Sequence, residues 1–292
     1  MNDKATPFTD TARAADTRPL PAPPTLWDAD TGTARRAART ALARLGNLAL
    51  ALAIFIACWI ALAALLDREI MPYPWEVWPV FVEEMGSGDL WDHTLISAQR
   101  VLQAIALAVL LATPIGMGLG QIRVLNRIFS PLIGLVHPIP KVVFLPVILV
   151  IMGIGETSKV FLIALILFFQ ILVVVRDEAA SLRPELIQSV RSLGAGRRAL
   201  FRYVYLPASL PAVLTALRVS VGTAIAVLFI AEQYSTREGL GYYIVTLTWQ
   251  RLRFEEMYAG ILAMSLLGLT LYMVVDVLER IVGRWRRAGE LD

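Results

Sequence analysis

Long stretches of this chain carry no charged residue, and this feature restricts its possible folds more than any other. The apolar runs cover residues 45–66, 101–122, 160–175 and 257–275, and two more, 128–152 and 207–231, contain one lysine or arginine each. A bilayer core about 30 Å thick is crossed by roughly 20 helical residues, and lipid offers backbone polar groups no other partner. The sequence therefore predicts an all-α, polytopic membrane protein with about six transmembrane helices.

Basic residues beside the runs indicate the orientation of the chain in the membrane. Arginines precede the first run and follow the last, and the segment 176–206 holds six Arg against three acids, whereas 67–97 is acidic. We therefore expect both termini and the loop 176–206 in the cytoplasm. Residues 1–44 are predicted to be a disordered, basic cytoplasmic tail, 45–285 a transmembrane domain, and 286–292 a second cytoplasmic tail.

Residue types needed for catalysis or metal binding are scarce. Cys58 is the only cysteine and His93 and His137 are the only histidines, so we expect no disulfide framework and no metal site. The phosphate-binding pattern GxxxxGK[ST] is absent, so any ATP chemistry must come from another chain. The net charge of +3 is small, and its uneven spread indicates topology rather than affinity for nucleic acid. We expect no catalytic residue and no cofactor in this chain.

The segment after the fourth run has the features of a short amphipathic helix. Pro184 suits the first helical position, and Glu185 and Arg191 complement the helix dipole at its two ends. The apolar positions share one face and are Leu186, Val190 and Leu193. Gly194 suits the left-handed conformation that commonly ends a helix. About ten residues are too few to cross a membrane, so the helix is predicted on the cytoplasmic side, against lipid or a partner protein.

This segment resembles the cytoplasmic loop of permeases of binding-protein-dependent ABC importers. The family pattern is Glu-Ala-Ala, three residues, Gly, nine residues, then Ile-x-Leu-Pro. Counted from Gly194, the first three slots fall on Gln188, Ser189 and Val190, and Leu206-Pro207 follow in register. The visible Glu178-Ala179-Ala180 stands ten residues too early. Gln188 departs from the pattern, because it keeps nearly the shape of Glu and loses the charge.

Further stretches look like the sulfonate, taurine and nitrate branch of these permeases, namely 71–78, 138–160, 192–219 and 238–244. The resemblance spans about residues 45–285 and implies a type I, six-span permease of the inner membrane. It implies a second permease copy, a cytoplasmic ABC ATPase dimer that binds ATP and Mg²⁺, an external solute-binding protein and surrounding lipid. In the family the short helix inserts into a cleft on the ATPase. The residues implied for this coupling site are Pro184, Glu185, Leu186, Ile187, Gln188, Ser189, Val190, Arg191, Leu193, Gly194, Ala195, Leu206 and Pro207.

The implied substrate is a small solute of the sulfonate, taurine or nitrate kind, with an aromatic acid or a pyrimidine-type vitamin precursor as the alternative.

Five residues are candidates for the translocation path: Pro138, Pro140, Lys141, Arg218 and Glu232. Cations inside membrane spans are costly, so each is either paired structurally or functional. Lys141, beside two prolines that break the helix, either caps freed carbonyls or attracts an anion. Arg218 has the same two interpretations, with Glu232 expected as the nearest acid.

An ion-coupled secondary transporter is the rival class, and it predicts membrane carboxylates that the six runs almost lack.

Overall fold

The computed structural model describes residues 26–66, 70–234 and 236–282, which are helical and contain no strand. The chain divides into two units, Met1–Cys58 and Trp59–Asp292. The described residues of the first unit belong to α1 (Leu26–Leu65). The expectation of a disordered tail is corrected for residues 26–44, which are helical because Ala, Arg and Leu, strong helix formers, dominate 33–45. Residues 1–25 and the predicted tail 286–292 lie outside the described residues.

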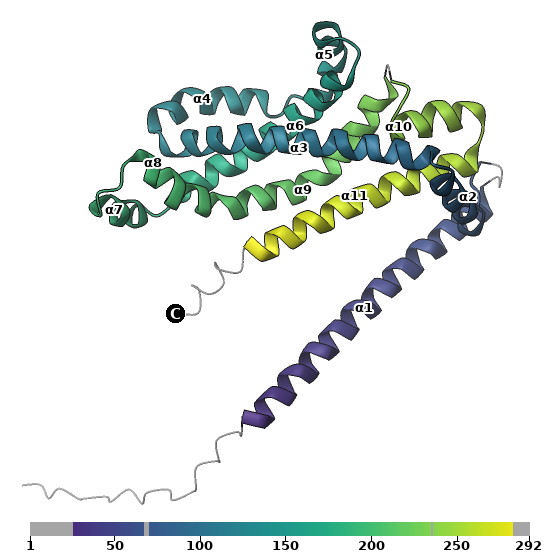
Figure 1. Cartoon of the computed structure of the whole chain (residues 1–292), viewed down its shortest axis with the longest axis horizontal. Helices are drawn as coiled ribbons and strands as arrows, with labels where there is room; N and C mark the ends of the chain where they lie inside the picture. The colour runs from purple at the N-terminus through teal and green to yellow at the C-terminus, as the bar shows by residue number, and fades with distance from the viewer. Residues whose placement is uncertain (1–25, 67–69, 235, 283–292) are drawn as a thin grey trace, which may run out of the picture. The chain divides into compact units, whose positions relative to one another are not determined.

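Four long helices form the centre of the second unit: α3 (Asp89–Gln121), α6 (Glu156–Ser181), α9 (Leu206–Gln233) and α11 (Phe254–Val282). In Figure 1, α3 lies along α6, α6 packs on α9, and α9 packs on α11. Each is long and apolar enough to cross a membrane, as is Gly46–Leu65. A bent helix pair brings the number in the described part of the chain to six when it is counted as one span, and the predicted all-α, multi-span fold class is confirmed.

The bent pair consists of α4 (Arg123–Val136) and a second arm that contains η1 (Lys141–Phe144) and α5 (Leu145–Met152). The two arms meet at 83°, and the break contains the two prolines of the sequence "HPIP". Each proline removes a helical hydrogen-bond donor and clashes with the preceding turn, so the helix cannot continue through them. The predicted helix break at the two prolines is therefore present.

Close packing of α3 on α6 depends on glycine. A Cβ atom at Gly120 would stand 2.5 Å from the Arg176 carbonyl oxygen and 2.7 Å from the Ala179 Cβ. The adjacent Gln121 side chain donates a hydrogen bond to the Ala179 carbonyl. Small residues allow two membrane helices to approach until their backbones interact, and this contact holds the ends of α3 and α6 together.

Short elements occupy the two ends of the bundle. At one end lie α7 (Pro184–Ser192), α8 (Arg197–Leu200) and η2 (Phe201–Tyr205). At the other lie α2 (Pro74–Ser87), α10 (Leu240–Tyr242), η3 (Tyr243–Thr248) and η4 (Trp249–Arg251) (Figure 1). The predicted functional residues therefore divide between two ends of one helical bundle.

Candidate functional site

The segment predicted to couple to a partner contains the helix α7, which begins at Pro184 and ends at Ser192. Gly194 has φ +82°, and its N–H donates to the Arg191 carbonyl at 2.9 Å. The N–H of Ala195 donates to the Val190 carbonyl at 3.4 Å. A left-handed glycine that returns hydrogen bonds to the last turn is a common helix ending, and it turns the chain sharply after α7. The local structure is as expected, and its coupling role stays a prediction.

The side chains of this segment leave apolar surface open. Leu193 is 85% exposed, and Ile187 and Val190 are half-buried. The exposed polar side chains are Glu185, Gln188, Ser189 and Arg191, and Ser189 donates to the Glu185 carbonyl at 2.8 Å. Leu206 and Pro207 form the first turn of α9, with Leu206 37% exposed. No described residue of this chain covers Leu193, so the end of the bundle offers it to lipid or to another protein.

Lys141 begins the second arm of the broken span and is only 8% exposed, whereas Pro138 and Pro140 are exposed. Its Nζ donates hydrogen bonds to three backbone carbonyl oxygens, those of Val136 (3.1 Å), His137 (2.8 Å) and Ile139 (3.2 Å). An ammonium group has three N–H donors, and all three are used here. The structure therefore supports the alternative in which Lys141 caps the carbonyls freed by the break.

Arg218 on α9 is paired with two carboxylates of α11. Its Nη1 lies 3.4 Å from Asp276 Oδ1 and 3.1 Å from Glu279 Oε2. The expectation that Glu232 is the acid nearest Arg218 is therefore wrong. Asp276 follows directly after an apolar run, and the helical turn that carries both acids continues that run along the same helix. Arg218 thus links α9 to α11 through ion pairs, which supports the interpretation that Arg218 is paired structurally.

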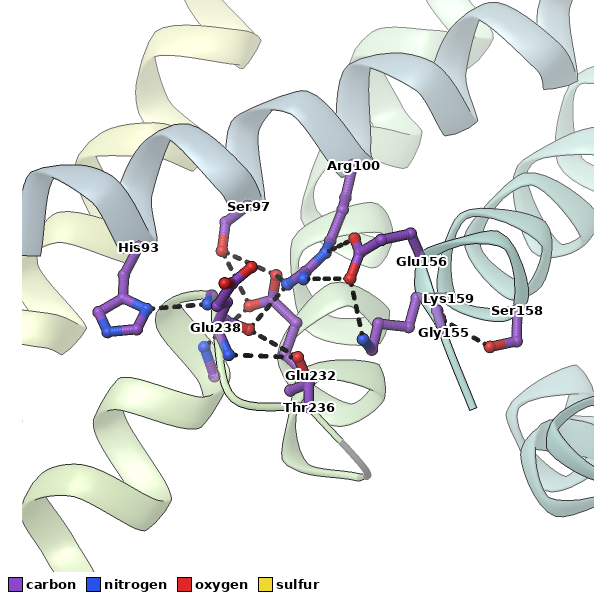
Figure 2. A network of polar contacts seen from close by, with 12 residues as sticks. His93, Ser97, Arg100, Gly155, Glu156, Ser158, Lys159, Glu232, Thr236 and Glu238 are labelled. Atoms are coloured by element: carbon purple, nitrogen blue, oxygen red, sulfur yellow. Dashed lines mark hydrogen bonds and ion pairs between the residues drawn. The ribbon is translucent and has the colours of Figure 1, made fainter. Parts of the chain in front are cut away.

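Glu232 is the centre of a buried polar network at the opposite end of the bundle (Figure 2). The side chain of Glu232 is fully buried, and Arg100 on α3 is 2% exposed. Three donors reach the Glu232 carboxylate: the Ser97 hydroxyl, which lies 2.8 and 2.9 Å from its two oxygens, Arg100 Nη1 (2.7 Å) and the Gly241 N–H (2.9 Å). A buried carboxylate is tolerated only when it is paired and hydrogen-bonded, and both conditions hold.

The other edge of the Arg100 guanidinium binds a second carboxylate. Arg100 Nε and Nη2 contact the two oxygens of Glu156 in the first turn of α6, the Nη2 contact being 2.6 Å. Lys159 Nζ lies 3.2 Å from Glu156 Oε1, and its side chain is 2% exposed. The charges of two cations and two carboxylates therefore cancel, and the four residues belong to three helices. Figure 2 shows Arg100 between the two acids.

A glycine-rich loop, residues 238–241, lies against the Arg100–Glu232 ion pair. Three further hydrogen bonds bind the loop to α3: Arg100 Nη1 to the Glu238 carbonyl (2.9 Å), Gly239 N–H to His93 Nδ1 (2.9 Å), and Leu240 N–H to Ser97 Oγ (2.8 Å). Gly239 has φ +106°, and a Cβ there would stand 2.5 Å from Glu232 Cδ. A Cβ at Gly241 would stand 2.7 Å from Glu232 Cβ. Only glycine allows the backbone to lie so close to the buried carboxylate.

Burial also affects a titratable group just beyond this loop. Burial raises the pKa of the Tyr243 phenol, and the Glu84 carboxylate acts in the same direction. Tyr243 therefore stays neutral at any physiological pH, and the packing that it makes at this end of the bundle does not change with protonation.

The network can hold helices together but offers no catalytic arrangement. Among the described residues, no group of three or more His, Cys, Asp or Glu side chains could hold a metal ion. Sequence reasoning singled out Glu232 and missed the partners of its network: Ser97, Arg100, Glu156 and Lys159. Arg100 stands one residue before a charge-free run, and Glu156 and Lys159 lie in a short polar turn. The signal that points to them is Glu232 itself, because a buried acid in a span requires a cation.

The fold and these sites together define a polytopic helical membrane subunit. Residues 104–288 match the family model described as the inner membrane component of binding-protein-dependent transport systems, and the chain belongs to this family. It is therefore the permease subunit of an ABC importer, a multi-pass inner membrane protein that is not itself an enzyme. The ATPase is a separate subunit of such importers, and the solute-binding protein is another partner.

Similar proteins come from distant organisms. The taurine transport system permease protein of Escherichia coli K12 is 30% identical over 241 residues, which are 80% of this chain and 87% of that protein. A putative ABC transporter permease of Methanocaldococcus jannaschii is 34% identical over 204 residues, 70% of this chain and 76% of that one. The riboflavin transport system permease of Chloroflexus aurantiacus is 31% identical over 216 residues, 74% of this chain and 80% of that one.

Among solved structures, an inward-facing form of the MetNI methionine ABC transporter is similar to this chain. The TM-score is 0.56 at 20% identity, and the match covers 69% of this chain and 99% of the matched one. At this identity the likeness supports the fold alone, and it agrees with the expected type I permease architecture.

Proposed function

We propose that two copies of this chain form the membrane pathway of an importer for small sulfonate-like solutes. An external binding protein delivers the solute to the end of the bundle that carries α10. A cytoplasmic ATPase dimer, which holds the ATP and Mg²⁺, docks on the end that carries α7. Both termini face the cytoplasm in this arrangement, and surrounding lipid covers the remaining apolar surface.

The observation that carries this proposal is the exposed helix α7. It is short, it ends in the left-handed Gly194, and it leaves Leu193 85% exposed. The segment around it is the most arginine-rich loop of the chain, which is typical of a cytoplasmic loop. An exposed apolar side chain at the end of a short helix that stops at a left-handed glycine suits insertion into an apolar groove on a partner.

Relatives support the substrate class. The taurine permease is 30% identical over 80% of this chain, and the putative aliphatic sulfonates permease of Escherichia coli is 28% identical over 77%. The riboflavin permease, at 31% identity, favours a second candidate, which is the same machinery importing an aromatic or vitamin-type solute. An ion-coupled carrier is disfavoured, because the carboxylates of Glu232, Asp276 and Glu279 are already engaged with arginines.

Docking is tested by co-purification of the ATPase with the permease variant Leu193→Asp. The expected result is loss of the ATPase, because a charge replaces the apolar group that enters the groove. Leu252→Asp is the matched control, since Leu252 is 73% exposed at the opposite end and its φ of +60° suits Asp. Equal retention of the ATPase by both variants would contradict docking at α7.

The substrate is tested by uptake in cells that express this chain with its own ATPase and binding protein. Labelled taurine is offered with an excess of unlabelled ethanesulfonate, nitrate or riboflavin. Competition by the sulfonate supports the proposal. Uptake of labelled riboflavin, measured in parallel, without any uptake of labelled taurine would select the second candidate instead.

A further inference from the structure

Two cavities that share lining residues lie beside α3, and together they are called the groove here. The first has a volume of about 560 Å³ and is lined only by apolar groups of α3, α4 and α6, including Phe129, Leu132 and Phe168. The second, of about 540 Å³, lies between the junction of α3 with α4 and the segment α7 to η2. Pro114 and Gly118 line both cavities, so the two cavities adjoin at these residues.

The two cavities differ in charge. Arg123 and Arg191 line the second, and no acidic residue lines either one. Both arginine side chains are exposed, and neither forms an ion pair with a carboxylate of a described residue, unlike Arg218 or Arg183. The groove therefore has two uncompensated guanidinium groups at one end and an apolar chamber at the other.

We propose that this groove binds an anionic phospholipid. The headgroup phosphate lies between Arg123 and Arg191, and an acyl chain passes Gly118 into the apolar cavity. Planar guanidinium groups bind phosphate through paired, charge-assisted hydrogen bonds. Each cavity has a volume typical of ligand sites. A soluble anion would leave the apolar cavity empty, whereas a phospholipid matches both halves.

The position of the groove agrees with a lipid ligand. The helices α3 and α6 are candidate spans and α4 is one arm of the bent pair, so we expect the apolar cavity to lie at membrane depth. Basic pockets between spans on the cytoplasmic side bind anionic headgroups. Arg191 belongs to α7, so the bound lipid would link the proposed docking helix to α4. The leaflet assignment rests on the proposed orientation, but the binding itself does not rest on ATPase docking.

Lipid binding is measured on the full-length purified permease, without ATPase, by native mass spectrometry during titration with phosphatidylglycerol or phosphatidylcholine. The wild-type chain is expected to retain phosphatidylglycerol preferentially. The variant Arg123→Gln/Arg191→Gln is expected to bind it at least about tenfold more weakly, because two basic contacts are lost. Arg183→Gln/Arg198→Gln removes the same charge from exposed arginines outside the groove and is expected to bind normally.

A second variant tests the apolar half without changing the charge. A Cβ at Gly118 meets no atom within 4 Å and Gly118 lines both cavities, so the side chain of Gly118→Leu is expected to extend into the space where they adjoin. It is expected to weaken phosphatidylglycerol binding while thermal unfolding stays unchanged. Equal weakening by the control pair would overturn the proposal, as would full displacement of the lipid by inorganic phosphate. Absence of any bound lipid from the wild-type chain, as expected if a second copy covers the groove, would also overturn it.

Discussion

Replacing Arg100 by Gln should destabilise the bundle strongly, because Arg100 compensates a carboxylate that water does not reach. Glu232 is fully buried, and among the described residues Arg100 supplies its only ionic contact. The substitution leaves that charge with the Ser97 hydroxyl and one backbone N–H. Removing one partner of a buried ion pair typically costs about 3–5 kcal/mol. The two remaining donors favour the lower value, so we expect a loss of about 3 kcal/mol.

Arg218→Gln is the matched control for this substitution. Arg218 also faces two carboxylates of a neighbouring helix, but its side chain is 34% exposed where that of Arg100 is 2% exposed. Solvent screening reduces the value of a partly exposed pair to about 1 kcal/mol or less. The two variants therefore differ in the burial of the arginine and not in the chemistry of the change.

The assay is thermal unfolding of the purified permease in detergent. At about 2–4 °C per kcal/mol for a unit of this size, Arg100→Gln should lower Tm by about 10 °C and Arg218→Gln by about 3 °C. Adding Glu232→Gln to Arg100→Gln removes the stranded charge, and it should recover part of the loss. Equal Tm shifts for the two arginine variants would show that burial of the ion pair does not determine its contribution.

Three further predictions concern single residues. Gly241→Ala should lower Tm by several degrees, because the new Cβ would stand 2.7 Å from Glu232 Cβ. Gly118→Ala is the control, since its Cβ enters open space, and it should leave Tm unchanged or slightly raised. Similar losses of Tm for both variants would contradict this. Gly194→Ala places a side chain at φ +82°, costs about 1 kcal/mol locally, and should weaken ATPase co-purification; unchanged retention would argue against a role for the helix ending. Gln188→Glu restores the acid of the family pattern and should make ATPase retention severalfold more resistant to salt. Unchanged salt resistance would show that the ATPase presents no cation to position 188.

The fold was predictable from the sequence because its main determinants are local. Charge-free runs, flanking arginines and the "HPIP" break each act within about 20 residues, and each corresponds to a described helix, an arginine-rich loop or a bend. The helix α7 was predictable in the same way, since Pro184, the dipole-compensating charges and Gly194 determine its ends without tertiary contacts. The start of α1 was missed because Pro and Asp residues upstream obscured the helix-forming segment that follows.

Tertiary pairing was the part that the sequence did not reveal. Ser97 and Glu232 are separated by 135 positions and Arg100 and Glu156 by 56, and a single sequence carries no signal that joins such distant residues. The glycines of the "EGLG" sequence lie in a stretch that was identified only by its resemblance to the family, and their role depends on the carboxylate that they contact. The close approach to Glu232, rather than the turn alone, requires glycine at positions 239 and 241.

The pairing of cations within the spans changes how the substrate should be studied. Arg100 and Lys159 face carboxylates, Arg218 faces two more, and Lys141 uses its three donors on carbonyl oxygens. Carboxylates compensate Arg100, Lys159 and Arg218, and the three Lys141 donors are already used, so these four cations are poorly suited to attract an anionic solute. A charge reversal such as Arg218→Glu would place three acids together and disturb the helix contact, so loss of uptake would not identify a pathway residue. Selection among solutes is therefore better sought in the binding protein and in the uncharged lining of the pathway than in these cations.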